Sequence, residues 1–174
     1  MRKLLFVLML LPSILFSQEV ENDKYSISKC IDEMTDKVYY FGSKKILCIS
    51  EDGEKGFALN VSFKEKAGVV KYGGIYVKSS GIGSCNEKSK LIILFEDGSK
   101  QTLTSWNDFN CEGDSFFDLA NTMLSKMVKP IKKLMFQDGR SFESYTHEVS
   151  EEDKNFFIEI IDAINEKNFK TTDC

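Results

Sequence analysis

A short acidic stretch, residues 108–114, has the residue types and spacing that best fit a chemical site. Asp108, Asn110 and Glu112 occupy alternate positions, and Gly113 and Asp114 follow them. Oxygen ligands at alternate positions before a glycine resemble the first half of a calcium-binding loop, because a tight bend points them at one centre. The bidentate glutamate of such loops is missing at the twelfth position. We therefore expect no cofactor and interpret the stretch as an acidic, solvated loop; calcium is the alternative that its spacing suggests.

Two patterns that could support catalysis are incomplete. Cys111 could form a thiol–imidazole pair with His147, the single histidine, but cysteines in secreted chains are more often bridged. Acidic pairs at 51–52, 96–97 and 151–152 fall at predicted turns and a helix start, where solvation explains them. We therefore predict no catalytic residues. A small secreted hydrolase with dispersed catalytic residues remains the alternative function, since dispersed sites leave no local motif.

Trp106, the only tryptophan, is the candidate binding aromatic. An exposed Trp106 could stack on a sugar ring or anchor a protein partner, whereas a buried one would pack the loop onto the domain. A flat, exposed aromatic surface around it would favour binding over catalysis. The expected function is a non-catalytic binding or interaction domain for an unknown protein, glycan or small ligand. An envelope or assembly subunit without a ligand is a further alternative.

The first 17 residues have the pattern of a secretory signal peptide. Arg2 and Lys3 give a positive start, residues 4–16 are mostly apolar, and Ser17 is a small residue at the expected cleavage point. The apolar run is shorter than the roughly 20 residues that a membrane span needs. We therefore expect a secreted or periplasmic protein, cleaved near Ser17, with no transmembrane segment in the mature chain.

The charge and the length narrow the class of partner and the number of domains. Removing residues 1–17 leaves 21 Lys and Arg against 27 Asp and Glu, a net charge of −6. An acidic domain is poorly suited to nucleic acid or to an anionic membrane. The 174 residues allow one domain with a sizeable core. We expect a polar N-terminal lead-in at 18–28 and a single domain at 29–174.

Five cysteines are compatible with two disulfides and one unpaired thiol. The favoured pair is Cys85–Cys111, because both flank the same predicted hairpin and a bridge would tie its open end. A second, weaker pair is Cys30–Cys48, although Cys48 lies in an apolar strand and could equally be a buried thiol. Cys174 could be free or could pair with another chain.

A predicted hairpin at 90–104 is the element around which the domain is arranged. Residues 91–95 form a continuous apolar run, which favours a strand covered on both faces. Asp97-Gly98 fits a two-residue turn, which would place Ile92 opposite Leu103. The return strand alternates only weakly, so we expect it near a sheet edge.

The remaining patterns predict an α+β fold, in which helices pack on one face of an antiparallel sheet built of hairpins. Residues 56–64 alternate as a half-buried strand. A capping-box pattern at Ser115–Asp118 predicts a short helix at about 116–128. A second such pattern at Ser150 predicts a C-terminal amphipathic helix at about 151–167, packed on one face of the sheet.

Overall fold

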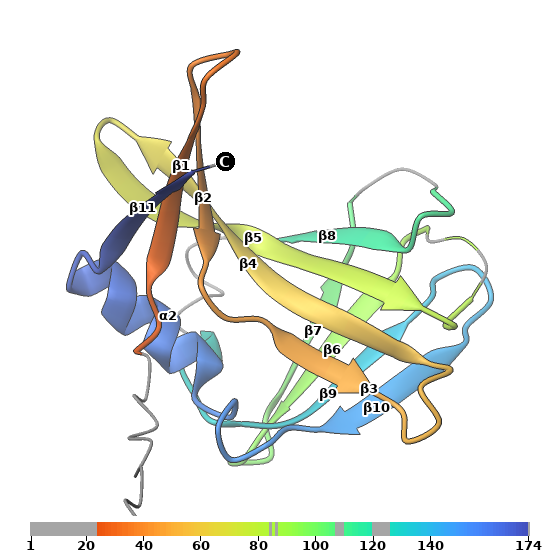
Figure 1. The fold of residues 1–174 in the computed structure, drawn as a ribbon. Helices are drawn as coiled ribbons and strands as arrows, with labels where there is room; N and C mark the ends of the chain where they lie inside the picture. Colours follow the sequence, from red (N-terminus) through yellow and green to blue (C-terminus); the bar gives the residue numbers. More distant parts are fainter. Residues whose placement is uncertain (1–23, 84, 86, 107–109, 120–125, 174) are drawn as a thin grey trace, which may run out of the picture.

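The computed structural model describes residues 24–83, 85, 87–106, 110–119 and 126–173. These residues form two β-sheets that face each other, with one helix at one end (Figure 1). Apolar side chains from both sheets and from the helix form one core between them. The expected antiparallel hairpins are present, but they build two sheets rather than one. No helix among the described residues is long and apolar enough to cross a membrane.

The larger sheet has seven strands in the order β11-β1-β2-β4-β5-β8, with β3 also pairing with β4. Its strands are β1 (Ile27–Asp32), β2 (Lys37–Gly42), β3 (Ile46–Ile49), β4 (Gly56–Lys66), β5 (Val69–Ser80), β8 (Asp114–Asp118) and β11 (Phe169–Asp173). The smaller sheet has the order β10-β9-β6-β7. Its strands are β6 (Lys90–Phe95), β7 (Lys100–Thr104), β9 (Ile131–Gln137) and β10 (Ser144–Glu148).

Strand β4 confirms the alternation that the sequence predicts. Phe57, Leu59, Val61 and Phe63 are buried, because they point into the core. The residues between them point to the opposite side, which we call the outer face of the larger sheet. Strand β5 follows the same alternation along the register with β4.

The hairpin at 90–104 is confirmed, but its register differs by one residue from the prediction. Leu91, and not Ile92, lies opposite Leu103. The amide of Phe95 donates to the carbonyl of Ser99, so three residues form the loop, and Gly98 adopts a φ of 80°. This is the three-residue hairpin loop that ends in a left-handed glycine. Strand β7 lies at a sheet edge as expected, whereas alternate residues of β6 are only half-buried.

The C-terminal helix is present but shorter than predicted. Helix α2 (Phe156–Asn165) buries Phe156, Phe157, Ile160 and Ala163. Residues 151–155 form turns instead, in which the Ser150 hydroxyl accepts a hydrogen bond from the Asp153 amide. The ring of Phe156 contacts Tyr25 edge-on, with 5.7 Å between ring centroids, so α2 closes the β1–β2 end of the core (Figure 1).

The helix predicted at about 116–128 is wrong at its start. Residues 114–118 form strand β8, which pairs with β5 and places Phe117 opposite Ile75. The capping-box pattern failed because Ser115 and Phe117 point into the core, while Phe116 and Asp118 point out, as in a half-buried strand. Residues 120–125 lie outside the described residues, and residues 126–127 are helical.

Both ends of the domain contain structure that the sequence analysis did not describe. Tyr25 and Ser26, which lie in the expected lead-in at 18–28, are buried, and β1 starts at Ile27. The prediction missed β11, which follows α2 and pairs in parallel with β1, with Phe169 opposite Ile27. Since the pairing partner of β11 lies at the other end of the domain, no local pattern marked it as a strand.

Candidate functional site

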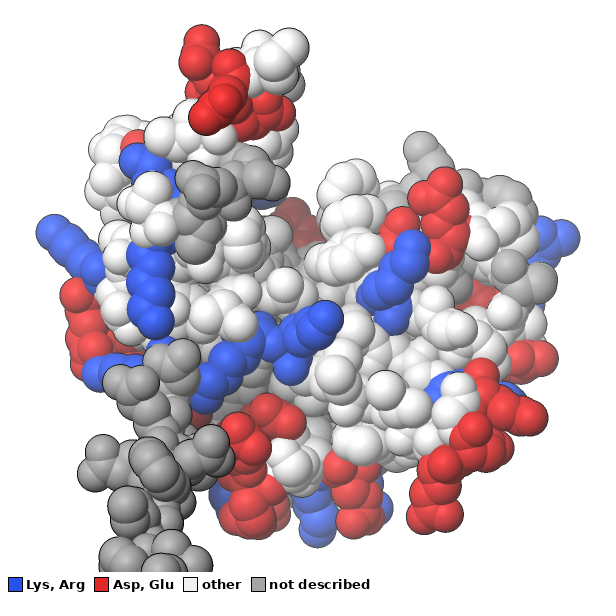
Figure 2. All heavy atoms as spheres, viewed as in Figure 1, with Lys and Arg blue, Asp and Glu red and all other residues white. Residues whose placement is uncertain are grey.

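The outer face of the larger sheet carries an unusual group of exposed apolar side chains. Six large ones lie on it or at its edge: Tyr39 (49% exposed), Phe41 (39%), Leu47 (49%), Ile49 (55%), Trp106 (69%) and Phe116 (40%). The cross-strand pairs that define the sheet place them on the side opposite the core. Figure 2 shows residues other than Lys, Arg, Asp and Glu over much of β3, β4 and β5, a few basic side chains among them, and acidic side chains at the margins. Large exposed apolar side chains gathered on one face of a sheet are typical of interaction sites.

Three of the rings on this face stack in series, an arrangement that we call the aromatic ladder. Tyr76 lies opposite Phe116 on the neighbouring strand, with 5.1 Å between ring centroids. Phe116 contacts Trp106 at 5.8 Å, with 38° between the ring planes. The Trp106 amide donates to the Phe116 carbonyl, which attaches the tryptophan to the edge of β8. The Trp106 indole is therefore supported on one side and open to solvent on the other.

A hollow of about 330 Å³ lies beside the ladder, and we call it the glycine groove. Gly73 and Gly74 line it together with Ser62, so much of its floor carries no large side chain. A Cβ at Gly74 would lie 2.7 Å from the Phe117 carbonyl oxygen, so only glycine fits there. Charged and aromatic side chains also line it, namely Lys64, Asp118, Trp106 and Phe116, and Ile75 and Phe117 complete the lining.

A second hollow of about 390 Å³ lies on the same side of the sheet, near the β3–β4 turn. Leu47 and Ile49 of β3 line it, and the small residues Gly56 and Ala58 of β4 contribute to its wall. Leu47, Ala58 and Lys78 are cross-strand neighbours in one row of the outer face. The outer face thus has two hollows, each made by small residues and bordered by exposed apolar side chains.

A charged pair beside the ladder holds it in place. Asp114 accepts hydrogen bonds from the Tyr76 hydroxyl and from Lys78, whose Nζ lies 2.9 Å away. Burial and the bond to Asp114 raise the pKa of Tyr76 to about 12. Partial burial would raise the pKa of Asp114, but the hydrogen bonds from Tyr76 and Lys78 outweigh it, and the pKa falls below its usual value.

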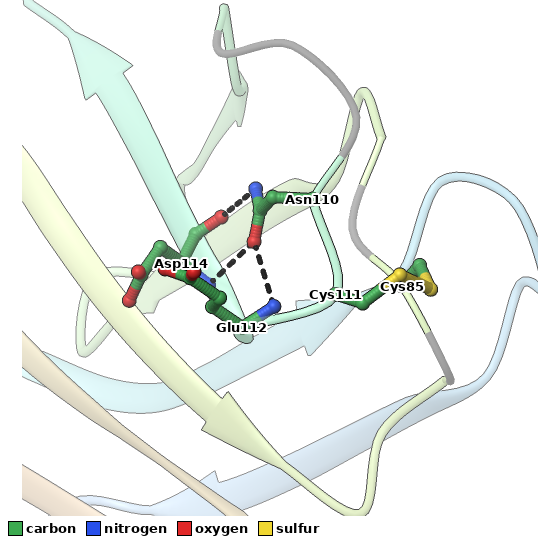
Figure 3. The surroundings of a disulfide bond; sticks show 5 residues. All are labelled: Cys85, Asn110, Cys111, Glu112 and Asp114. Atoms are coloured by element: carbon green, nitrogen blue, oxygen red, sulfur yellow. Dashed lines mark hydrogen bonds between the residues drawn. A yellow bond between two sulfur atoms is a disulfide. The ribbon is translucent and has the colours of Figure 1, made fainter.

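The predicted calcium-like loop satisfies its polar groups largely within the protein. Figure 3 shows the Asn110 carbonyl oxygen accepting from the amides of Glu112 and Asp114, both at 3.2 Å, while its amino group donates to the Asp114 carbonyl. The Asp114 carboxylate faces Tyr76 and Lys78 instead. Asp108 lies outside the described residues. Within the described chain, no three His, Cys, Asp or Glu side chains group as metal ligands. Calcium binding stays the alternative hypothesis for this loop.

The favoured disulfide, Cys85–Cys111, is present and ties this loop to the residues after β5 (Figure 3). The Cys30–Cys48 prediction is wrong, because Cys48 is a buried free thiol and Cys30 is in another disulfide. Burial raises the pKa of Cys48 to about 12, so its thiol stays protonated. Cys174 lies outside the described residues.

The disulfide also bears on the alternative catalytic pair. Cys111 has no free thiol in this structure, so it cannot act as a nucleophile toward His147. His147 lies half-buried on β10 of the smaller sheet, with its ring 6.4 Å from that of Tyr145. The acidic pairs at 51–52 and 96–97 lie in exposed turns, as predicted.

Sequence reasoning identified Trp106 but missed the surface around it. Phe116 was assigned to a helix, so it could not be placed beside Trp106 on a sheet face. All four residues of β3, Ile46 to Ile49, are apolar. A strand that is apolar at every position has apolar side chains on both faces, and this was the one signal in the sequence for an apolar outer face. Pairing with β4 was needed to assign which side each residue faces.

The comparisons with known proteins identify no relative: no protein-family model matches the sequence, and neither a curated protein nor a solved structure gives a significant match.

Proposed function

We propose that this protein is a secreted or periplasmic, non-catalytic binding domain, and that the outer face of the larger sheet is its ligand surface. One observation carries the proposal: six large apolar side chains share that face, and Trp106 is the most exposed of them. Leaving so much apolar surface in water is unfavourable unless a partner covers it. The β5–β8 pairing and the ring contacts of the ladder order this surface before a partner arrives, which lowers the entropic cost of binding.

The proposed location follows from the sequence. Arg2, Lys3 and the apolar run before Ser17 form the pattern of a cleaved signal peptide. The Cys85–Cys111 disulfide agrees with an oxidising compartment. Mass spectrometry of the protein recovered from its native cells would show an N-terminus close to Gln18. An intact N-terminus at Met1 would remove the basis for export.

A sedimentation experiment tests the binding function without knowledge of the ligand. Purified mature protein is mixed with the cell-envelope fraction of the cells that produce it, and the bound share is measured after centrifugation. We expect wild type to sediment, and the double variant Trp106→Ala/Phe116→Ala to stay in solution.

The matched control is Phe142→Asn, which removes an aromatic ring that is 68% exposed on the β9–β10 turn, away from the outer face. Asparagine tolerates the positive φ of that position better than most residues. The control should sediment like wild type. Equal sedimentation of all three proteins, or of none, would overturn the proposal.

A further inference from the structure

We propose that the glycine groove binds a carbohydrate chain of neutral, β-linked pyranose rings, with one ring stacked on Trp106. This inference rests on the proposed function and narrows it to one ligand class. Three features support it: an open aromatic platform, a lining that contains polar and charged groups, and a row of small residues that crosses the sheet.

The aromatic platform suits the flat side of a sugar. The face of an aromatic ring carries negative charge density, and the polarised C–H groups of a pyranose ring are attracted to it. β-Linked rings with equatorial substituents present such C–H groups on a flat side. Since Phe116 supports the Trp106 indole at 5.8 Å and Tyr76 supports Phe116, the platform is ordered before a ligand arrives.

The polar lining suits hydroxyl groups, which both donate and accept. Lys64 offers a donor, Asp118 an acceptor, and the Ser62 hydroxyl, which donates to the Gly74 carbonyl at 3.3 Å, can accept. Neither Lys64 nor Asp118 has an ion pair within the described chain. An apolar peptide side chain would leave both charges desolvated and unmatched, which is costly. The acidic protein also disfavours a polyanionic glycan.

The shape suits a chain rather than a single ring. Phe41, Ser62, Gly74 and Asp118 are successive cross-strand neighbours on β2, β4, β5 and β8. Neighbouring strands lie about 4.8 Å apart, so this row spans roughly 14 Å. Its middle members are small, and exposed aromatic rings stand near both ends, Phe41 at one and Phe116 with Trp106 at the other.

Direct titration tests the ligand class. Cellohexaose, chitohexaose and laminarihexaose are added separately to the mature protein, and emission from the single tryptophan is followed. We expect a saturable change with at least one hexasaccharide. Calorimetry with that sugar should show affinity at least about tenfold weaker for Trp106→Ala, Phe116→Ala and Asp118→Asn, and unchanged for Phe142→Asn. No saturable binding of any of the three would overturn the carbohydrate assignment.

The envelope assay separates failure of this inference from failure of the proposed function. The envelope fraction is treated either with periodate, which cleaves the vicinal diols of sugars, or with a protease. Loss of sedimentation after periodate alone supports the carbohydrate. Loss after protease alone overturns the carbohydrate but keeps the binding function with a protein as partner. An untreated fraction that binds wild type no better than Trp106→Ala/Phe116→Ala overturns both.

Discussion

The two faces of the larger sheet are built by the same strands, yet they have opposite relations to water. On β8, Phe117 is 1% exposed and packs into the core, whereas its neighbour Phe116 is 40% exposed. On β3, Ile46 and Cys48 are buried, while Leu47 and Ile49 are exposed. Apolar residues therefore occupy both faces, but the inner ones gain more free energy from folding because they are removed from water almost completely. The inner face therefore contributes most of the stability, whereas the exposed side chains of the outer face remain accessible to a ligand.

Phe116 and Phe117 give the sharpest test of this division. Phe117→Ala should lower the free energy of unfolding by about 3–5 kcal/mol, because it leaves a cavity in the core. Phe116→Ala should cost less than about 1 kcal/mol, since its ring is exposed, but should abolish envelope sedimentation. Urea unfolding and the sedimentation assay measure both quantities. Similar losses of stability in the two variants would contradict the division.

The disulfide should have the next largest effect, and on stability rather than on ligand binding. The double variant Cys85→Ser/Cys111→Ser should lose about 3 kcal/mol, because the unfolded chain regains the freedom of a loop closed across 26 residues. Phe116 is held by the β5–β8 pairing and not by the bridge, so sedimentation below the unfolding transition should persist. A folded double variant that no longer binds would show that the outer face depends on the loops at its margin.

Acid should weaken the support of the aromatic ladder by a smaller amount. The pKa of Asp114 is lowered on folding, so its contribution to stability is present above the unfolded pKa of about 3.9 and is lost as pH falls through the lower, folded value. The melting temperatures of wild type and Asp114→Asn should therefore differ at pH 6, begin to approach each other below about pH 3.9, and converge once the pH is below the lower, folded pKa of Asp114. The exposed pair with Lys78 contributes at most about 1 kcal/mol. If the two melting temperatures differed by the same amount at every pH, the effect of Asp114 would come from packing and not from its charge.

Calcium should have the smallest effect. Asn110 is already used by two backbone amides, and Asp114 by Tyr76 and Lys78, so binding would require these contacts to be exchanged. We expect the melting temperature in millimolar calcium to match that in a chelator. A rise that is lost in Asn110→Ala would instead support the predicted calcium loop, since a ligand of the native state stabilises it by mass action.

The sequence predicted elements with strong local patterns. The alternation of Phe57, Leu59, Val61 and Phe63 identified β4, and the apolar stripe around Phe157 identified the C-terminal helix. Both patterns arise because a regular strand or helix buries one of its sides. The resulting periodicity can be recognised within a short stretch of sequence.

Features set by long-range pairing were not predictable in this way. Ser115–Asp118 has a local pattern typical of a helix start, and it became a strand because β5 offers a pairing edge. The predicted hairpin register was wrong by one residue, because Asp97-Gly98 fits both a two-residue and a three-residue loop. The proposed ligand surface was missed for the same reason: its residues come from β2, β3, β5, β8 and the segment after β7.

The parallel pairing of β1 with β11 has a consequence for how the protein is made. Ile27 lies opposite Phe169, so the larger sheet cannot close while the later residues are still inside the ribosome or an export channel. Synthesis adds about 5–20 residues per second, which leaves the earlier strands waiting for seconds with an unpaired edge. Such a chain completes folding only after release, a sequence of events that suits a protein kept unfolded for export.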